Sequence, residues 1–236
     1  MDTEAVESVH LFQKWIKDHQ AQALVSTDGD GDRPLVIDNL GRVVPGDKIG
    51  ILTSQLLGVK GVALPISCNS AISEMPDFQD VVFTKIGSPY VVEALDQLTK
   101  KGNSCAGFEA NGGYILNSEI FSNSISLKPL PTRDSILPIL SVLATCVDNK
   151  KSLSEIVDQL PPRYTSSILV KNCAPSISEN LLKELSLNPN RLLQNILTFP
   201  TENSLNSERS LKDMENSDFS IKEINSLDGI PFTLAN

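Results

Sequence analysis

The sequence predicts an α/β fold in which mixed, mostly parallel sheet layers are flanked by helices. Short apolar segments alternate with longer amphipathic ones between residues 45 and 150, the order that a mostly parallel sheet with crossover helices requires. Apolar residues recur at three- and four-residue spacing in residues 4–18, as in a helix that covers a sheet. Of the 236 residues, 40% are hydrophobic, which is enough for one large core or two smaller ones.

The expected elements follow this pattern along the chain. Besides the first helix, we expect a strand at 21–26, a glycine-rich loop, and a strand, turn and strand over 35–44. In the alternating region we expect helices at 46–57, after Cys68, at 88–100 and at 133–147, the last with Asp134 in its first turn, and strands at 61–64, 81–84 and 105–109. Beyond residue 150 we expect a helix at 153–160, strands at 166–170, 221–224 and 230–234, and an exposed polar connection at 201–218.

Composition limits the classes of protein that fit. The formal net charge is −9, and no cluster of basic residues is present, so a nucleic-acid-binding role is disfavoured. The four cysteines stand singly without a CxxC pair, which argues against a zinc site and is typical of reduced thiols in the cytoplasm. The acidic N-terminus and the absence of an apolar run of roughly 20 residues favour a cytoplasmic protein that does not enter a membrane.

The most informative segment is Asp28-Gly29-Asp30-Gly31-Asp32-Arg33, directly after an apolar strand. Three carboxylates at alternate positions, separated by glycines, can converge on one hard cation without obstruction by other side chains. A solvated turn would not require this density of negative charge. We therefore expect Asp28, Asp30 and Asp32 to bind a divalent cation.

Two other kinds of loop share part of this pattern. An EF-hand beginning at Asp28 would need glycine at its sixth position and glutamate at its twelfth, where this chain has Arg33 and Asn39. A haloacid-dehalogenase phosphatase would have DxDxT after its first strand, and here Asp32 takes the place of the threonine. The EF-hand is thereby excluded, and the phosphatase remains a minor alternative in which Asp28 would be the nucleophile.

Residues 28–33 match the D-G-D-G-D-R signature of the α-D-phosphohexomutases, the family of phosphomannomutase and phosphoglucomutase, at every position. The resemblance implies that Asp28, Asp30 and Asp32 bind Mg²⁺ and that Arg33 acts on the phosphate side of the catalytic site. It also implies transfer of phosphate between C1 and C6 of a hexose phosphate.

Two further segments resemble this family. Gly107-Phe108-Glu109-Ala110-Asn111-Gly112-Gly113 is similar to its sugar-binding loop, with Asn111 where serine is usual, which implies substrate contacts from Glu109 and Asn111. Thr84-Lys85-Ile86-Gly87-Ser88 resembles a K-x-G loop before a helix, which implies that Lys85 and Gly87 face a bound phosphosugar.

The chain also departs from the family pattern. Ser88 stands where some members have histidine, and residues 65–69 hold no lysine where some members have a proposed general acid or base. Neither of the two histidines, His10 and His19, has a carboxylate or cysteine cluster beside it, so both are interpreted as surface or packing residues.

The resemblance suggests three parts. Residues 1–44 resemble the end of the family's second domain, 45–150 its third domain, and 151–236 a linker with an incomplete fourth domain. The family's phosphoserine loop and its C-terminal phosphate-binding loop do not occur in the sequence, so the isolated chain is expected to be an inactive fragment that self-associates through unpaired sheet edges. The alternative is a non-catalytic α/β module that binds a sugar phosphate or a cation.

Overall fold

The computed structural model describes residues 6–122 and 125–163, together with residues 176, 180, 183–184, 187, 220–224 and 232–235. The chain divides into two compact units, Met1–Thr165 and Ser166–Asn236. In the second unit the described strands β10 (Ser220–Ile224) and β11 (Phe232–Ala235) pair antiparallel, which confirms the predicted strand pair in this region. The predictions for 166–170 and 201–218 fall outside the described residues. No described helix has both the length and the apolar character needed to cross a membrane.

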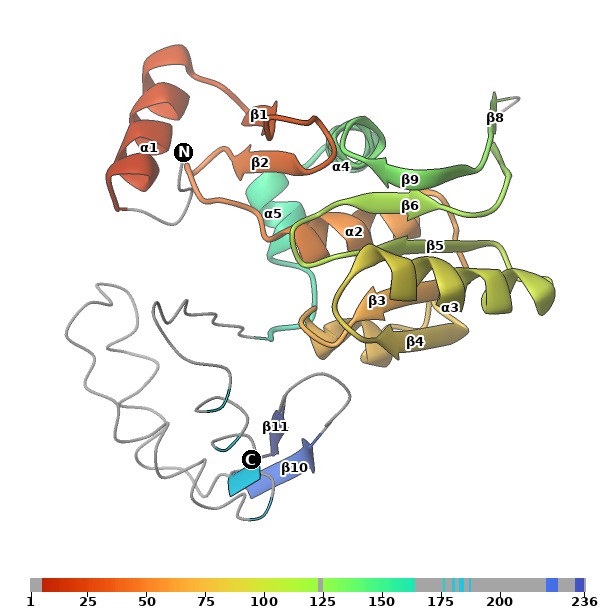
Figure 1. Cartoon of the computed structure of the whole chain (residues 1–236). Coiled ribbons are helices and arrows are strands. Elements are labelled where there is room, and N and C mark those ends of the chain that lie inside the picture. The colour runs from red at the N-terminus through yellow and green to blue at the C-terminus, as the bar shows by residue number, and fades with distance from the viewer. Residues whose placement is uncertain are drawn as a thin grey trace. The chain divides into compact units, whose positions relative to one another are not determined.

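A five-stranded mixed sheet organises the first unit (Figure 1). Its order is β4 (Asp80–Thr84), β3 (Gly61–Pro65), β5 (Cys105–Phe108), β6 (Tyr114–Leu116) and β9 (Leu130–Asp134). Strand β3 pairs parallel with β4 and β5, whereas β6 pairs antiparallel with β5 and β9. Because β3, β4 and β5 run in the same direction, the loops that follow them leave the sheet at one edge, where parallel sheets commonly bind ligands.

Helices cover both faces of this sheet. On one face, α3 (Ser88–Lys100) packs Val91, Leu95 and Leu98 against Ala63, Cys105 and Ile115. On the other face, Ile51 of α2 (Gly46–Leu56) joins a core with β3, β5, β6 and the 3-10 helix η1 (Ser70–Glu74). Figure 1 shows α3 and α2 on these two sides. The arrangement confirms the predicted α/β layer, whose strands are buried because both faces are covered.

A second core joins the N-terminal hairpin to this layer. Strands β1 (Ala23–Thr27) and β2 (Pro34–Asp38) pair antiparallel, so residues 28–33 form the closed end of the hairpin. Val36 of β2 packs against α2, α4 (Ile136–Asn149) and α5 (Leu153–Val157), while Ile37 packs against Phe12 and Ile16 of α1 (Val6–His19). The hairpin is therefore fixed on both sides by buried apolar contacts.

Two local predictions were wrong. The expected second strand at 42–44 is reduced to an isolated bridge between Ile37 and Val43. The helix expected at 133–147 begins only at Ile136, because residues 130–134 form β9, whose Asp134 is paired with Tyr114 of β6. The Asp134 carboxylate lies before the first turn rather than in it and accepts the amides of Ile136 at 2.8 Å and Leu137 at 3.3 Å. A small antiparallel pair, β7 (Ile120–Ser122) and β8 (Ile125–Leu127), was also not predicted.

Candidate functional site

The aspartate loop, residues 28–33, is shaped by its own hydrogen bonds. Asp28 Oδ1 accepts the amides of Asp32 at 3.2 Å and Arg33 at 3.1 Å. The Asp28 amide in turn donates to the Arg33 carbonyl at 3.2 Å, and Gly31 adopts φ 77°, a conformation that favours glycine. One oxygen of Asp28 thus stabilises the turn, and the other faces the Arg33 guanidinium.

The three carboxylates of this loop converge. One oxygen each from Asp28, Asp30 and Asp32 lies within 4.8 Å of the others. Asp28 Oδ2 and Asp32 Oδ1 are buried and accept no hydrogen bond from the described residues. The Arg33 guanidinium faces them: its Nε pairs with Asp28 Oδ2 and lies 3.5 Å from Asp32 Oδ1. Two buried carboxylate oxygens that face the Arg33 guanidinium, gathered close to a third carboxylate, fit a hard divalent cation.

The protonation state of Asp28 suits that role. Burial acts to raise its pKa, but the hydrogen bond from the Arg33 amide and the charge of the Arg33 guanidinium outweigh it and hold the pKa below its ordinary value. The same ion pair raises the pKa of Arg33. Asp28 is therefore ionised at neutral pH, as a cation ligand must be.

The Glu109 loop, residues 109–113, makes the tight turn from β5 to β6. The Gly112 amide donates to the Glu109 carbonyl at 2.9 Å, and Gly112 adopts φ 89°. Asn111 is exposed, and its Oδ1 accepts the amide of Gly113 at 3.0 Å. Glu109 is buried, with 8% of its surface exposed. The loop thus presents one buried carboxylate and one exposed amide side chain at the edge of the sheet where the parallel strands end.

The Glu109 loop packs closely against Gly46 of α2 and against Pro34, the residue after the aspartate loop. A Cβ added at Gly46, the first residue of α2, would lie 2.5 Å from the Ala110 carbonyl oxygen and would overlap the Gly112 amide. A Cβ at Gly112 would lie 2.8 Å from Cγ of Pro34, the residue after the aspartate loop. Because these separations leave no room for a side chain, glycine permits the close approach.

Two residues at the junction of β9 and α4 contact the aspartate loop, and one of them also contacts the Glu109 loop. The Arg133 guanidinium pairs with Asp32 Oδ2 through one nitrogen and lies 3.4 Å from Glu109 Oε2 through the other. The buried Ser135 hydroxyl donates to the Gly31 carbonyl at 2.6 Å. Sequence reasoning missed both residues, because only the pairing of β9 with β6 brings them to the aspartate loop.

The structure places Lys85 and Gly87 apart from the aspartate loop and the Glu109 loop. They follow β4, which is separated from β5 by β3 in the sheet. Lys85 Nζ lies 5.8 Å from the centre of the Tyr90 ring, a cation–π contact with the next helix. Gly87, with φ 126°, precedes the first turn of α3. Lys85 and Gly87 thus share the sheet edge with Glu109 but not its contacts.

The loop after β3 holds a buried thiol where some family members have lysine. Burial raises the pKa of Cys68 well above its ordinary value, and the nearby Asp47 and Glu109 charges act in the same direction. Cys68 is therefore a neutral thiol at physiological pH and is not poised to accept a proton.

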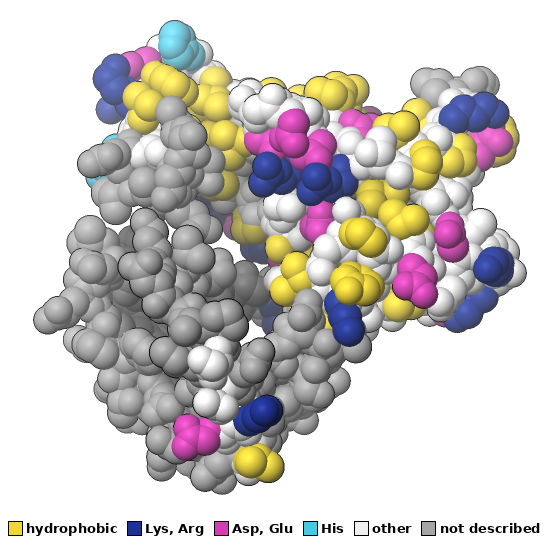
Figure 2. Space-filling view, in the orientation of Figure 1, with side chains coloured by type: hydrophobic (Ala, Val, Ile, Leu, Met, Phe, Trp, Pro, Cys, Tyr) yellow, Lys and Arg dark blue, Asp and Glu magenta, His cyan; other side chains and the backbone are white. Residues whose placement is uncertain are grey.

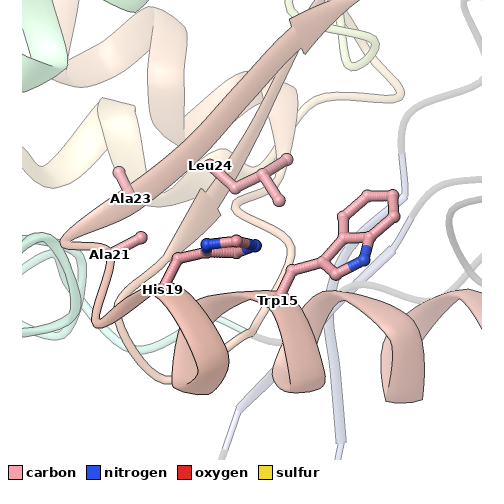
Figure 3. Close-up of a pocket in the computed structure, with 5 residues that line it drawn as sticks. All are labelled: Trp15, His19, Ala21, Ala23 and Leu24. Atoms are coloured by element: carbon pink, nitrogen blue, oxygen red, sulfur yellow. The ribbon is translucent and has the colours of Figure 1, made fainter.

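The surface view supports the location of the site. Figure 2 shows Asp and Glu side chains beside Lys and Arg side chains near the closed end of the β1–β2 hairpin. A separate open pocket lies between α1 and β1, lined by Trp15, His19, Ala21, Ala23 and Leu24 (Figure 3). This lining has no carboxylate to bind a cation, so the pocket is distinct from the candidate site.

The fold and the site together define an α/β protein with a loop of three converging carboxylates beside the turn from β5 to β6. Residues 45–164 match the family model described as phosphoglucomutase/phosphomannomutase, alpha/beta/alpha domain III, and the chain belongs to this family. It is therefore a phosphohexomutase-family chain, and the phosphatase and binding-module alternatives are not favoured.

Individual relatives agree with this assignment. The chain is 46% identical over 184 residues to a phosphomannomutase of Salmonella muenchen, covering 77% of this chain and 38% of the relative. It is 41% identical over 160 residues to a phosphomannomutase of Sinorhizobium fredii, covering 66% and 34%. A phosphoglucomutase/phosphomannomutase family protein from Burkholderia thailandensis has the same fold, with a TM-score of 0.61 at 14% identity, covering 98% of this chain and 42% of that one. The chain thus spans less than half the length of these proteins.

Proposed function

We propose that this chain provides the cation-binding and sugar-binding loops of a phosphohexomutase, which moves a phosphate group between C1 and C6 of a hexose phosphate. The observation that carries the proposal is the convergence of three aspartate carboxylates, with two buried oxygens lacking hydrogen bonds, beside the Glu109 loop. Family membership and the names of the two phosphomannomutase relatives support the same reaction class.

In this proposal the aspartate loop binds the cation and contacts the phosphate group. Asp28, Asp30 and Asp32 bind Mg²⁺, which when bound neutralises charge on the transferring phosphoryl group. Arg33 lies against all three carboxylates, with its terminal nitrogen 3.9 Å from Asp30, and presents positive charge on the phosphate side. Its guanidinium is suited to phosphate oxygens, which it can contact through two parallel donors.

The loops at the sheet edge serve the sugar. Asn111 already uses its Oδ1 within the turn, so its side-chain N–H groups are the donors that it offers to a sugar hydroxyl. The Glu109 carboxylate is an acceptor for hydroxyl protons. Lys85 and the backbone at Gly87, before the first turn of α3, provide positive charge and amide donors for the phosphosugar.

The experiment is a calorimetric titration of Mg²⁺ into the purified chain and into Asp30→Asn. Asp30 is the most exposed of the three ligands, at 67% of its side chain, and its longer ion pair makes this substitution the least disruptive to the loop. We expect saturable binding by the unmodified chain and loss of at least tenfold in affinity in the variant, because a charged ligand to a hard cation is removed.

The matched control is Asp96→Asn, which removes the same charge from an exposed position on α3. It should bind Mg²⁺ as the unmodified chain does. Equal affinity in Asp30→Asn, or no saturable binding by the unmodified chain, would contradict the proposed cation site.

A further inference from the structure

We propose that Arg133 is a positioning residue that couples cation binding to sugar binding, because a single guanidinium holds Asp32 of the aspartate loop and Glu109 at once. The inference rests on the proposed function of these two loops. Arg133 acts on the cation and on the sugar through these two carboxylates.

The two oxygens of the Asp28 carboxylate have different partners, and so do those of Asp32. In Asp28, Oδ1 accepts two loop amides, and Oδ2 is left without a hydrogen bond. In Asp32 the division is repeated, since Oδ2 pairs with Arg133 and Oδ1 is left without a hydrogen bond. Arg133 therefore does for Asp32 what backbone amides do for Asp28: it fixes the rotation of the carboxylate so that the other oxygen points toward the cation position.

Arg133 also provides the partner for the charge of Glu109. Its carboxylate is nearly buried, and a buried charge is strongly unfavourable without a partner of opposite charge. Arg133 provides that partner through the guanidinium nitrogen not used by Asp32, at 3.4 Å. Because the guanidinium is a rigid planar group, a displacement of Asp32 is passed on to Glu109.

Arg133 is itself held in place by its strand and by the Glu109 loop. Its backbone lies in β9 next to Asp134, which is paired with Tyr114 of β6. Its aliphatic stem packs on the Glu109 loop so closely that a Cβ at Gly113 would lie 2.8 Å from Arg133 Cδ. The side chain is only 30% exposed. Arg133 is thus held on a strand and against a turn, as a positioning residue requires.

Simple electrostatics predicts the opposite effect of removing Arg133. A positive charge beside a cation site repels the cation, so its removal should tighten Mg²⁺ binding. A positioning role predicts weaker binding, because Asp32 loses its fixed orientation. Lysine separates these explanations further, since it keeps the charge but cannot span two carboxylates with a planar fork.

The first test is Mg²⁺ titration of the full chain with Arg133→Gln and Arg133→Lys. We expect both variants to bind Mg²⁺ more weakly, by about tenfold, the lower end of the range for residues that orient metal ligands. Arg163→Gln is the matched control, because Arg163 pairs with Glu74 away from both loops, and it should leave the affinity unchanged. Unchanged or tighter binding in Arg133→Gln, or full affinity in Arg133→Lys, would overturn the inference.

The second test does not depend on metal. Amide NMR signals of residues 109–113 should shift in Asp32→Asn relative to the unmodified chain. Adding Asp32→Asn to the Arg133→Gln variant should cause no such shift relative to Arg133→Gln alone. Asp30→Asn is the control, because Asp30 pairs with Arg33 and not with Arg133, so its substitution should leave these signals in place.

The two tests separate the two proposals. A shift that persists in the double variant, or no shift in Asp32→Asn, would refute the coupling through Arg133. Absence of Mg²⁺ binding by the unmodified chain would count against the proposed function instead, and the NMR signals would still decide whether Arg133 links the loops.

Discussion

Gly46, the first residue of α2, has no side chain, and this permits α2 to begin directly against the Glu109 loop. Its Cα faces the backbone of the Glu109 loop, and a Cβ added at Gly112 would meet both Pro34 and Gly46. Gly46, the Glu109 loop and the Pro34 ring therefore meet in close contact. The position of the Glu109 loop relative to the aspartate loop depends on this contact.

We predict that Gly46→Ala destabilises the chain by about 2 kcal/mol, within the range for overpacking a tight contact, because the added methyl group overlaps the Gly112 amide and the Ala110 carbonyl. Urea unfolding measures the change. Gly61→Ala is the control, since a Cβ there meets neighbours no closer than 3.4 Å, an ordinary contact distance. Equal stability of the two variants would show that the Glu109 loop yields at no cost.

Among individual residues, sequence reasoning identified those that belong to a contiguous motif. The spacing of Asp28, Asp30 and Asp32 is itself the reason that their oxygens can converge. Arg133 and Ser135 carry no such local pattern, because their role depends on partners 101 and 104 positions earlier in the chain, at Asp32 and Gly31 respectively. Long-range ion pairs of this kind are not encoded in periodicity or spacing.

The N-terminus of α2 contains a buried carboxylate. Asp47 is 4% exposed and accepts the amides of Lys48 and Asn69, both at 2.8 Å. Burial nevertheless raises its pKa above the ordinary value of 3.8. The folded chain therefore binds this proton more tightly than the unfolded chain does. Protonation of Asp47 favours folding at low pH, and this contribution is lost as the pH rises through the raised pKa.

We predict that Asp47→Asn is less stable than the unmodified chain near pH 4, because an asparagine side chain has one acceptor oxygen for two amides. The difference should narrow toward pH 7, since only the unmodified chain must ionise a buried group. Urea unfolding of both proteins across this pH range measures the difference. A gap that widens with pH would mean that the ionised carboxylate stabilises α2.

The elements that sequence reasoning missed share a physical cause. Strand β6 has only three residues, all buried, and β9 is largely exposed, so neither shows the alternation that marks a half-buried strand. The parallel strands β3, β4 and β5 were recognised because each is a short apolar run followed by a helix or a turn. Tertiary pairing, rather than local preference, makes residues 130–134 a strand.

For the whole molecule, the fold class followed from the alternation of strands and helices, but the joining of the hairpin to the layer did not. That joining depends on Val36, Ile139 and Leu153, which come from three separate segments and share one core. The proposed division at residues 1–44, 45–150 and 151–236 remains a prediction. It can be tested by limited proteolysis, which should cut near residue 150, where the side chains are exposed, and not near Val44, which is buried.

We also predict that the chain self-associates. In the described part of the chain, β1 pairs only with β2, and the neighbouring Val25 and Trp15 are 42% and 38% exposed. An unpaired strand edge beside apolar side chains favours association. Sedimentation velocity should show oligomers, and Val25→Lys should shift them toward monomer, whereas Val147→Lys on α4 should not. A monomer at every concentration would refute this.

The hydrogen bonds that Asp28 makes within its own loop have a consequence for how the site fills. Since the backbone is already ordered around Asp28 Oδ1, an arriving cation does not have to organise the chain, and little conformational entropy is lost on binding. Affinity then depends mainly on charge and on dehydration of the ion. Because Asp30 is exposed, ionic strength, which screens charge at exposed positions, should weaken the proposed cation binding.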